Sequence, residues 1–157
     1  MIMKIDWKKL ITSLIITLGV GALSAFITRD NMDIYSTLNN PPLSPPGWLF
    51  PVVWTILYTL MGISLYLIRI AREDRGKGAA YIAFAVQLFL NFIWSPIFFN
   101  QRAFLFAFVV LILMWLAIIA MIVLFYRIRR AAAYLNIPYL LWVTFAAYLN
   151  LGIFILN

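Results

Sequence analysis

The chain has 157 residues, of which 66% are hydrophobic and 11% are charged, and its mean hydropathy is +1.00. A soluble domain of this size could not bury so much apolar surface, so the composition excludes an ordinary soluble globular protein. The net charge is +7, and the absence of cysteine excludes disulfides and thiolate chemistry.

Five long segments that are nearly free of charge predict transmembrane helices. Each has about 20 residues or more, which is enough to cross a hydrocarbon core of about 30 Å. Because the backbone finds no water there, helices are the expected spanning form. The predicted fold class is an all-α membrane protein, a single domain (1–157) built as a bundle of five transmembrane helices. The spans are 8–28, 46–69, 79–99, 103–127 and 134–156, with a proline-rich connector over 29–45.

The apolar run of the first span begins after three lysines and contains a pair of small residues, Gly21 and Ala25, four positions apart. Such a pair permits close contact between helices. A cleaved signal peptide is an alternative for this segment, with Ala22-Leu23-Ser24 as the cleavage site. The apolar run continues through Ile27, however, and has full spanning length, which favours a retained helix.

The connector and the second span carry the most informative pattern in the chain. Four prolines within residues 41–46 cannot continue a helix and predict a stiff, extended segment. Pro46 suits the first turn of the helix that follows. On that helix Trp54, Tyr58 and Gly62 follow i, i+4 and i+8, so they share one face.

The third and fifth spans carry similar stripes of aromatic and amide side chains. On the third span, Ser95-Pro96 is expected to end or kink the helix. Three helices would thus each present indole, phenol or amide groups from an apolar wall, which predicts a ligand cavity. Hydrogen bonds between helices are the structural alternative for each stripe. The stripes are Gln87, Asn91 and Trp94, and Tyr139, Trp142, Ala146 and Asn150.

The basic residues predict the orientation of the bundle. Ten of the twelve precede the first span or follow the second and fourth, and only Arg29 and Arg102 fall on the opposite side. By the positive-inside rule, the N-terminus is cytoplasmic and the C-terminus is outside, in an integral protein of the plasma membrane. Topology and contact with membrane lipids explain the positive charge, and no nucleic-acid partner is expected.

Missing residue types narrow the chemistry. The chain has no histidine or cysteine, and its five acidic residues all lie outside the spans. A proton-coupled transporter usually needs an ionisable group within the membrane. The commonest zinc and haem ligands are absent, so no metal site is predicted and no cofactor is required. A nucleophilic triad cannot be assembled either.

Three blocks make the chain resemble the tryptophan-rich sensory protein family, also called the translocator protein or peripheral-type benzodiazepine receptor family, in its bacterial form. The resemblance extends over nearly the whole chain. The blocks are P-P-G-W-x2-P-x2-W-x3-Y-x2-M-G from residue 45, Q-x3-N-x2-W-S-P-x-F-F from residue 87, and P-Y-x2-W-x5-Y-x-N from residue 138.

The resemblance implies a five-helix receptor, commonly a homodimer, with a pocket for porphyrins such as protoporphyrin IX and for drug-like benzodiazepine- or isoquinoline-type molecules. It also implies light- and oxygen-dependent porphyrin degradation, with catalytic roles for Trp54 and Trp142. The resemblance assigns Tyr35, Trp54, Asn91, Trp94, Trp142 and Ala146 to ligand binding, and the helical stripes add Tyr58, Gln87 and Tyr139.

Two other functions remain open from the sequence. One is transport of porphyrin or lipid, and the other is a stress-sensing membrane scaffold without chemistry. Animal members of the family carry a cholesterol motif that ends in a basic residue late in the fifth helix. No Lys or Arg follows Tyr148 here, so sterol recognition is not expected.

Overall fold

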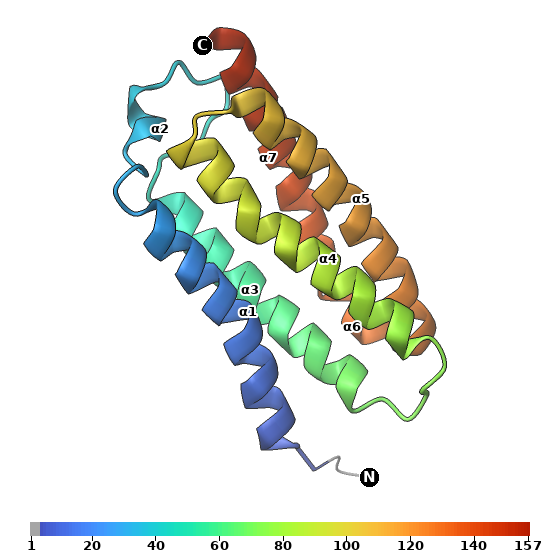
Figure 1. Ribbon diagram of the computed structural model, residues 1–157. Coiled ribbons are helices and arrows are strands. Elements are labelled where there is room, and N and C mark those ends of the chain that lie inside the picture. Colours follow the sequence, from blue (N-terminus) through green and yellow to red (C-terminus); the bar gives the residue numbers. More distant parts are fainter. Residues whose placement is uncertain (1–3) are drawn as a thin grey trace.

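Five helices long and apolar enough to cross a membrane dominate the computed structural model, which describes residues 4–157 (Figure 1). No strand occurs within that range, which confirms the predicted all-α fold class. The helices are α1 (Trp7–Thr28), α3 (Leu49–Arg69), α4 (Lys77–Ser95) with its π-helical continuation η1 (Pro96–Asn100), α5 (Phe104–Ile128) and α7 (Ile137–Leu156). The connections contain two short helices, α2 (Ile34–Thr37) and α6 (Arg130–Tyr134).

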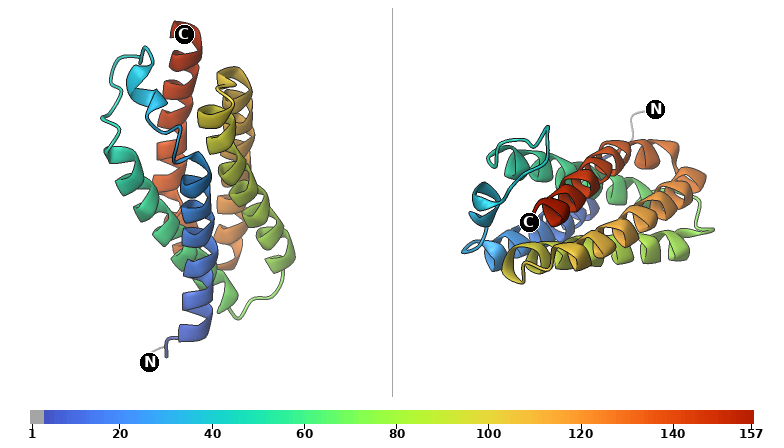
Figure 2. Two further views of the ribbon diagram at one scale, coloured as in Figure 1. Left: turned by 60° about the vertical axis from the view of Figure 1, so that its left-hand side comes forward. Right: turned by 90° about the horizontal axis from the view of Figure 1, so that it is seen from above.

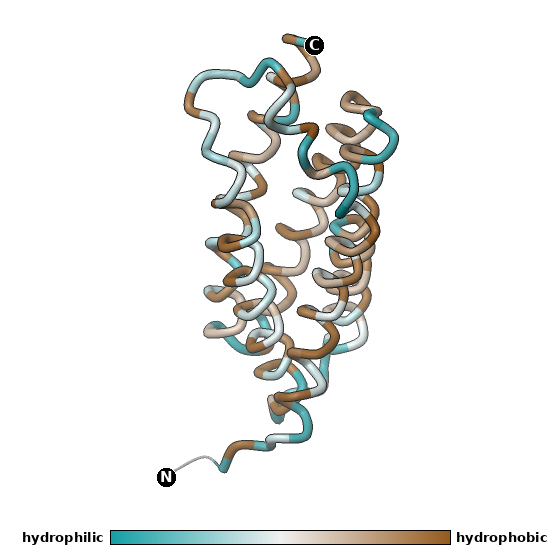
Figure 3. Tube along the Cα trace, turned by 90° about the vertical axis from the view of Figure 1, so that its left-hand side faces the viewer, coloured by the Kyte–Doolittle hydropathy of each residue, from teal (hydrophilic) through white to brown (hydrophobic). Residues whose placement is uncertain are grey.

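The long helices pack in two groups around a shared apolar core. Helix α1 contacts α3 and α4, while α5 contacts α4 and α7 (Figures 1 and 2). Met61, Met114 and Ile118 are fully buried at the centre. Large apolar side chains also cover the outside of the bundle, and hydrophilic segments gather toward its two ends (Figure 3). An apolar exterior between two polar ends is the pattern of an integral membrane protein.

The chain reverses so that the predicted basic loops come together. The start of α1, the α3–α4 connection and the α5–α6 junction lie at one end of the bundle, which we call the basic end (Figure 1). The connector between α1 and α3, the turn after η1 and the C-terminus lie at the other, which we call the connector end. Ten of the twelve Lys and Arg residues belong to the basic end by position.

The connector differs from the stiff, extended segment that its prolines predict. It contains α2 and then doubles back, with Leu43 at a φ of 70° and the Ser44 hydroxyl donating to the Pro41 carbonyl over 2.6 Å. Helix α3 begins at Leu49 and not at Pro46, because residues 46–48 form a turn in which the Leu49 N–H donates to the Pro46 carbonyl. Proline therefore sets the path of this segment without keeping it straight.

Pro96 does not end the third spanning segment. The helix widens there into the π turn of η1, in which the Gln101 N–H donates to the Pro96 carbonyl over 3.0 Å. Proline lacks an N–H and clashes with the preceding turn, and a wider turn relieves both constraints. The other span boundaries differ from prediction by up to four residues, the largest shift being the early start of the last segment at Arg130.

Candidate functional site

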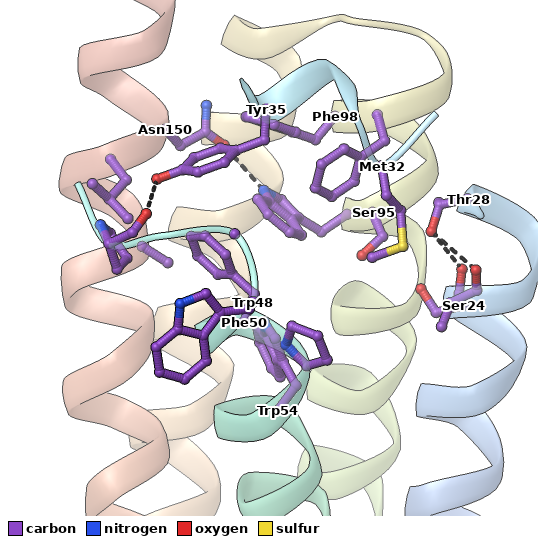
Figure 4. Close-up of a pocket in the computed structure, with 18 of the residues that line it drawn as sticks. Ser24, Thr28, Met32, Tyr35, Trp48, Phe50, Trp54, Ser95, Phe98 and Asn150 are labelled. Carbon is purple, nitrogen blue, oxygen red and sulfur yellow. Dashed lines mark hydrogen bonds between the residues drawn. The ribbon is translucent and has the colours of Figure 1, made fainter. Parts of the chain in front are cut away.

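A cavity of about 720 Å³ opens at the connector end of the bundle (Figure 4). Its walls come from α1, α3, α4 with η1, and α7, and the connector covers it. Cavities of roughly 300–1,000 Å³ are typical for drug-sized ligands. The site therefore has the size of a small-molecule pocket and is assembled from segments far apart in the sequence.

Aromatic rings form much of the cavity wall. Tyr35 of the connector packs edge-on against Phe50, with ring centroids 5.0 Å apart, and Phe50 packs in the same manner against Trp142 at 5.8 Å. On the opposite helices Trp94 stacks on Phe98 at 5.1 Å. The π turn of η1 brings Phe98 into this wall, so the unusual backbone after Pro96 has a direct effect on the site.

Seven of the nine residues predicted to bind ligand line the cavity, while the structure buries the other two beneath it. The seven are Tyr35, Trp54, Tyr58, Asn91, Trp94, Trp142 and Ala146. Gln87 and Tyr139 are buried, with 0% and 1% of their surface exposed, and do not line the cavity. Their stripes continue one helical turn below the cavity floor, because helical spacing fixes a face but not a depth.

The buried amides bond to tyrosines and form a network under the cavity. The Tyr58 hydroxyl donates to Asn91 Oδ1 over 2.6 Å, and Asn91 Nδ2 donates to the Tyr139 hydroxyl over 2.7 Å. Tyr139 in turn donates to Gln87 Oε1 over 2.8 Å. Asn91 therefore fixes the tyrosine that forms part of the floor, and its amide is already engaged within the protein.

Trp94 is held in a similar way at the top of the site. Its indole N–H donates to Asn150 Oδ1 over 3.0 Å (Figure 4). Asn150 Nδ2 donates to the Phe104 carbonyl. Asn150 lines the cavity and is 1% exposed. The pair fixes the plane of one indole wall.

Two buried polar atoms, each belonging to a residue that lines the cavity, have no partner within the part of the chain that the structure describes. They are the indole nitrogen Nε1 of Trp142, which is a donor, and the amide oxygen Oδ1 of Asn40, which is an acceptor. Buried polar groups in proteins are nearly always hydrogen-bonded. Both atoms are buried, so they lie behind the cavity surface and are not open to it in this structure.

Charge is scarce around the cavity. Among residues 4–157, Asp33 in the connector is the one charged residue that lines it. Partial burial raises the pKa of the nearby Tyr35 phenol above its ordinary value of 10.0, and a hydrogen bond with Ser44 opposes that shift. Tyr35 is therefore a neutral phenol near pH 7, and its hydroxyl donates to the Pro45 carbonyl over 2.8 Å.

The first helix contributes a cavity wall that the sequence did not reveal as such. Gly21, Ser24, Ala25 and Thr28 line the cavity at i, i+3, i+4 and i+7. The Gly21–Ala25 pair predicts close helix contact, and Gly21 does meet the Tyr58 ring so closely that an added Cβ would overlap it. The small side chains leave the space that the aromatic walls enclose. In the sequence, the regular spacing of these small residues was the one signal that could have predicted this wall.

Comparisons with known proteins agree with this architecture. The model of the TspO/MBR family matches residues 13–156. The chain is 39% identical over 142 residues to the tryptophan-rich protein TspO of Chlorobaculum tepidum, covering 89% of this chain and 90% of that protein. It is 36% identical over 155 residues to the tryptophan-rich sensory protein of Cereibacter sphaeroides, covering 99% and 95%.

The sequence similarity extends to animal proteins. The chain is 35% identical over 138 residues to the translocator protein of Homo sapiens, covering 85% of this chain and 80% of that protein. The match to the family model takes in most of the first spanning helix, the connector and the four other spanning helices. This protein therefore belongs to the TspO/MBR family, as its ordered motifs predicted.

Proposed function

We propose that this protein is a membrane receptor that binds porphyrins, protoporphyrin IX among them, and benzodiazepine- or isoquinoline-type molecules in the cavity at the connector end. The observation that carries the proposal is the aromatic cavity of about 720 Å³ built from four spanning segments and the connector. A flat apolar macrocycle suits walls of indole and phenyl rings, which offer large contact area without charge. The names of the relatives support a receptor and leave the ligand open.

The charge of the cavity sets how a porphyrin lies in it. No Lys or Arg lines the cavity among the described residues, and Asp33 lies at its connector side. Burying a carboxylate without a cationic partner is costly. The macrocycle therefore enters with its carboxylate edge toward the connector and water, and with its apolar edge toward Trp54 and the Tyr58 floor.

We further propose that bound porphyrin is degraded in light and oxygen, with Trp54 and Trp142 in catalytic roles. The pigment absorbs the light and oxygen is the oxidant, while the indoles hold the ring and trap reactive intermediates. Trp54 lies 5.6 Å from Tyr58 and 6.2 Å from Tyr139 between ring centroids. Trp142 also lines the cavity, and its N–H is unpaired within residues 4–157.

The test is the absorbance of a protoporphyrin IX complex of purified protein, followed in the dark and under illumination. Trp54→Phe and Trp142→Phe keep most of the apolar wall but remove the oxidisable indole. We expect dark binding within about tenfold, or roughly 1.4 kcal/mol, of the parent, and loss of most light-dependent degradation.

Two variants serve as controls. Trp115→Phe removes an indole that lies outside the cavity and donates to the Thr144 hydroxyl, and Trp7→Phe removes one that is 62% exposed at the start of α1. Both should degrade porphyrin as the parent does. Parent-like degradation in both cavity variants would remove the catalytic role and leave a binding protein. Absence of dark binding by the parent would overturn the receptor proposal.

Orientation and assembly complete the proposal. We infer a plasma-membrane protein with a cytoplasmic N-terminus, because ten of twelve basic residues gather at the basic end. Reporter fusions that place the C-terminus in the cytoplasm would contradict this orientation.

We also infer a homodimer, to be tested by cross-linking in lipid vesicles. Dark binding without light-dependent loss would favour the transporter or scaffold alternatives, and movement of porphyrin across liposomes would identify a transporter.

A further inference from the structure

The junction between α5 and α6, at the basic end of the bundle, concentrates positive charge without a nearby acid in the sequence (Figure 1). Arg127, Arg129 and Arg130 lie within four residues of one another, and no Asp or Glu follows Asp74 in the chain. The ion pairs found among residues 4–157 all involve other cations. The three guanidinium groups therefore carry a charge that no carboxylate of the described chain neutralises.

The cations of the other basic segments are engaged within the protein. At the start of α1, Lys9 Nζ lies 3.8 Å from Asp6, and in the α3–α4 connection Lys77 Nζ lies 3.3 Å from Asp74. Arg69 turns inward and donates to the Lys9 carbonyl. The α5–α6 junction thus differs from its neighbours in composition and in the pairing of its charges.

Two tyrosines hold one of the arginines in place. The guanidinium carbon of Arg130 lies 5.3 Å from the centroid of the Tyr126 ring, and Tyr126 packs edge-on against Tyr134 at 6.1 Å. The two rings are 43% and 59% exposed, so this face is open to the outside of the bundle. A guanidinium group over a ring uses its flat face, which leaves the N–H donors at its edge available to an oxyanion.

The backbone places this polar face at the end of an apolar surface. Helix α5 ends at Ile128, Arg129 is extended with a φ of −153°, and α6 begins at Arg130. Exposed apolar side chains follow on the neighbouring turns of α5 and α7, namely Val123, Ile137 and Leu141. Arginine and tyrosine beside an exposed apolar wall are suited to an amphiphile, with its headgroup at the membrane interface and its chains along the helices.

We propose that the α5–α6 junction is a binding site for the headgroup of an anionic phospholipid in the leaflet at the basic end. Arg127, Arg129 and Arg130 supply donors to the phosphate, since a guanidinium fork matches an oxyanion. A lipid with net negative charge is favoured over a zwitterionic one, because the site carries three cations and no acid. The site is separate from the cavity, none of whose lining residues belongs to α5 or α6.

The test compares two lipids that differ in headgroup charge. Native mass spectrometry of the full-length protein, released from detergent micelles, gives apparent dissociation constants for the first bound phosphatidylglycerol and the first bound phosphatidylcholine of the same acyl chains. The test variant combines Arg127→Gln, Arg129→Gln and Arg130→Gln. The control variant removes the same number of charges from exposed side chains elsewhere at the basic end, with Lys8→Gln, Arg72→Gln and Arg75→Gln.

We expect the parent to bind phosphatidylglycerol about tenfold more tightly than phosphatidylcholine. The junction variant should lose most of this preference, while the control variant should keep it within about twofold. Equal loss in the two variants would attribute the preference to the net charge of the basic end and overturn the site. An equal affinity of the parent for the two lipids would overturn it as well.

A second pair of variants keeps every charge. Tyr126→Leu removes the ring that orients Arg130, and Tyr81→Leu removes a tyrosine of α4 that is 37% exposed. We expect the preference to fall about threefold in Tyr126→Leu and to stay unchanged in Tyr81→Leu. An unchanged preference in Tyr126→Leu would contradict the proposed geometry. Displacement of phosphatidylglycerol by an equal concentration of soluble glycerol phosphate would identify a site for free phosphate and overturn the lipid assignment.

Discussion

The two halves of the bundle differ in what their buried polar groups contact. Toward the basic end, Arg69 Nη1 donates to the Lys9 carbonyl and to the hydroxyls of Thr12 and Ser13, at 2.7–3.0 Å. Ser64 donates to the Ala132 carbonyl over 2.7 Å and accepts from Asn136 Nδ2 at the same distance. These bonds tie helices to one another, and the space between them is filled.

Toward the connector end, polar atoms surround a space. Trp142 and Asn40 line the cavity, and the indole N–H of Trp142 and the side-chain oxygen of Asn40 are buried without partners in the described chain. One further buried oxygen without a partner among residues 4–157, Asn136 Oδ1, lies toward the basic end and does not belong to a residue that lines the cavity. Similar residue types thus tie helices together in one half and line a cavity in the other.

The Tyr58–Asn91–Tyr139 network lies at the border between the halves, so breaking it should have the largest effect. Asn91→Leu removes the acceptor of Tyr58 and a donor to Tyr139. We expect the free energy of unfolding to fall by about 2–3 kcal/mol, together with weaker porphyrin binding, because buried hydroxyls are left unpaired. Thermal unfolding in detergent and equilibrium binding measure the two effects.

The control for Asn91→Leu is Gln101→Leu, at an exposed amide in the turn after η1. It should leave both quantities near those of the parent, since an exposed amide exchanges one set of water contacts for another. If Asn91→Leu and Gln101→Leu proved equally stable and equally able to bind, the network would not support the cavity floor.

The packed half should be sensitive to a single added methyl group. At Gly62, a Cβ would lie 2.8 Å from both Leu14 Cδ2 and Thr17 Oγ1, and 3.1 Å from the Leu14 backbone. We expect Gly62→Ala to lower the free energy of unfolding by about 1–3 kcal/mol, because α1 and α3 must separate. Gly19→Ala, at a position with nothing within 4 Å, is the matched control and should unfold no more easily than the parent.

The same change in the cavity half should act on binding more than on stability. At Gly21, a Cβ would overlap the Tyr58 ring, which borders open space. The ring can move into the cavity, so we expect Gly21→Ala to weaken porphyrin binding about fivefold, roughly 1 kcal/mol, with a smaller loss of stability than Gly62→Ala. Equal losses of stability in the two variants would show that the halves are packed alike.

The smallest effect on ligand affinity is expected at Asp33, on the connector side of the cavity. Asp33 repels the carboxylates of a bound porphyrin, so Asp33→Asn should tighten binding of protoporphyrin IX by about two- to threefold at low salt and less at high salt. The affinity for the dimethyl ester of protoporphyrin IX, which carries no carboxylate, should not change in Asp33→Asn. Asp30→Asn is the control, because Asp30 lies beside Arg29 and does not line the cavity. An equal gain for the ester would attribute the effect to something other than charge.

Composition was sufficient to predict the number of spans and the helical class, and the three ordered motif blocks were sufficient to predict the family. Runs of about 20 or more apolar residues leave the backbone no other way to satisfy its hydrogen bonds in a membrane, so local composition is enough. Helical periodicity also identified the faces that carry Trp54, Asn91 and Trp142, since residues four apart must share a side. These features depend on neighbours along the chain.

The depth of each residue and the identity of its partner followed only from the packing of the helices. Gln87 shares a face with Asn91, yet only Asn91 reaches the cavity, because depth is set by how far the helices and the connector stand apart. The wall from α1 and the unpaired Asn40 oxygen depend on contacts between segments far apart in sequence, such as Asn39 with Asn157. Periodicity along one helix carries no information about those distances, and so the pocket's polar contacts emerged only with the folded chain.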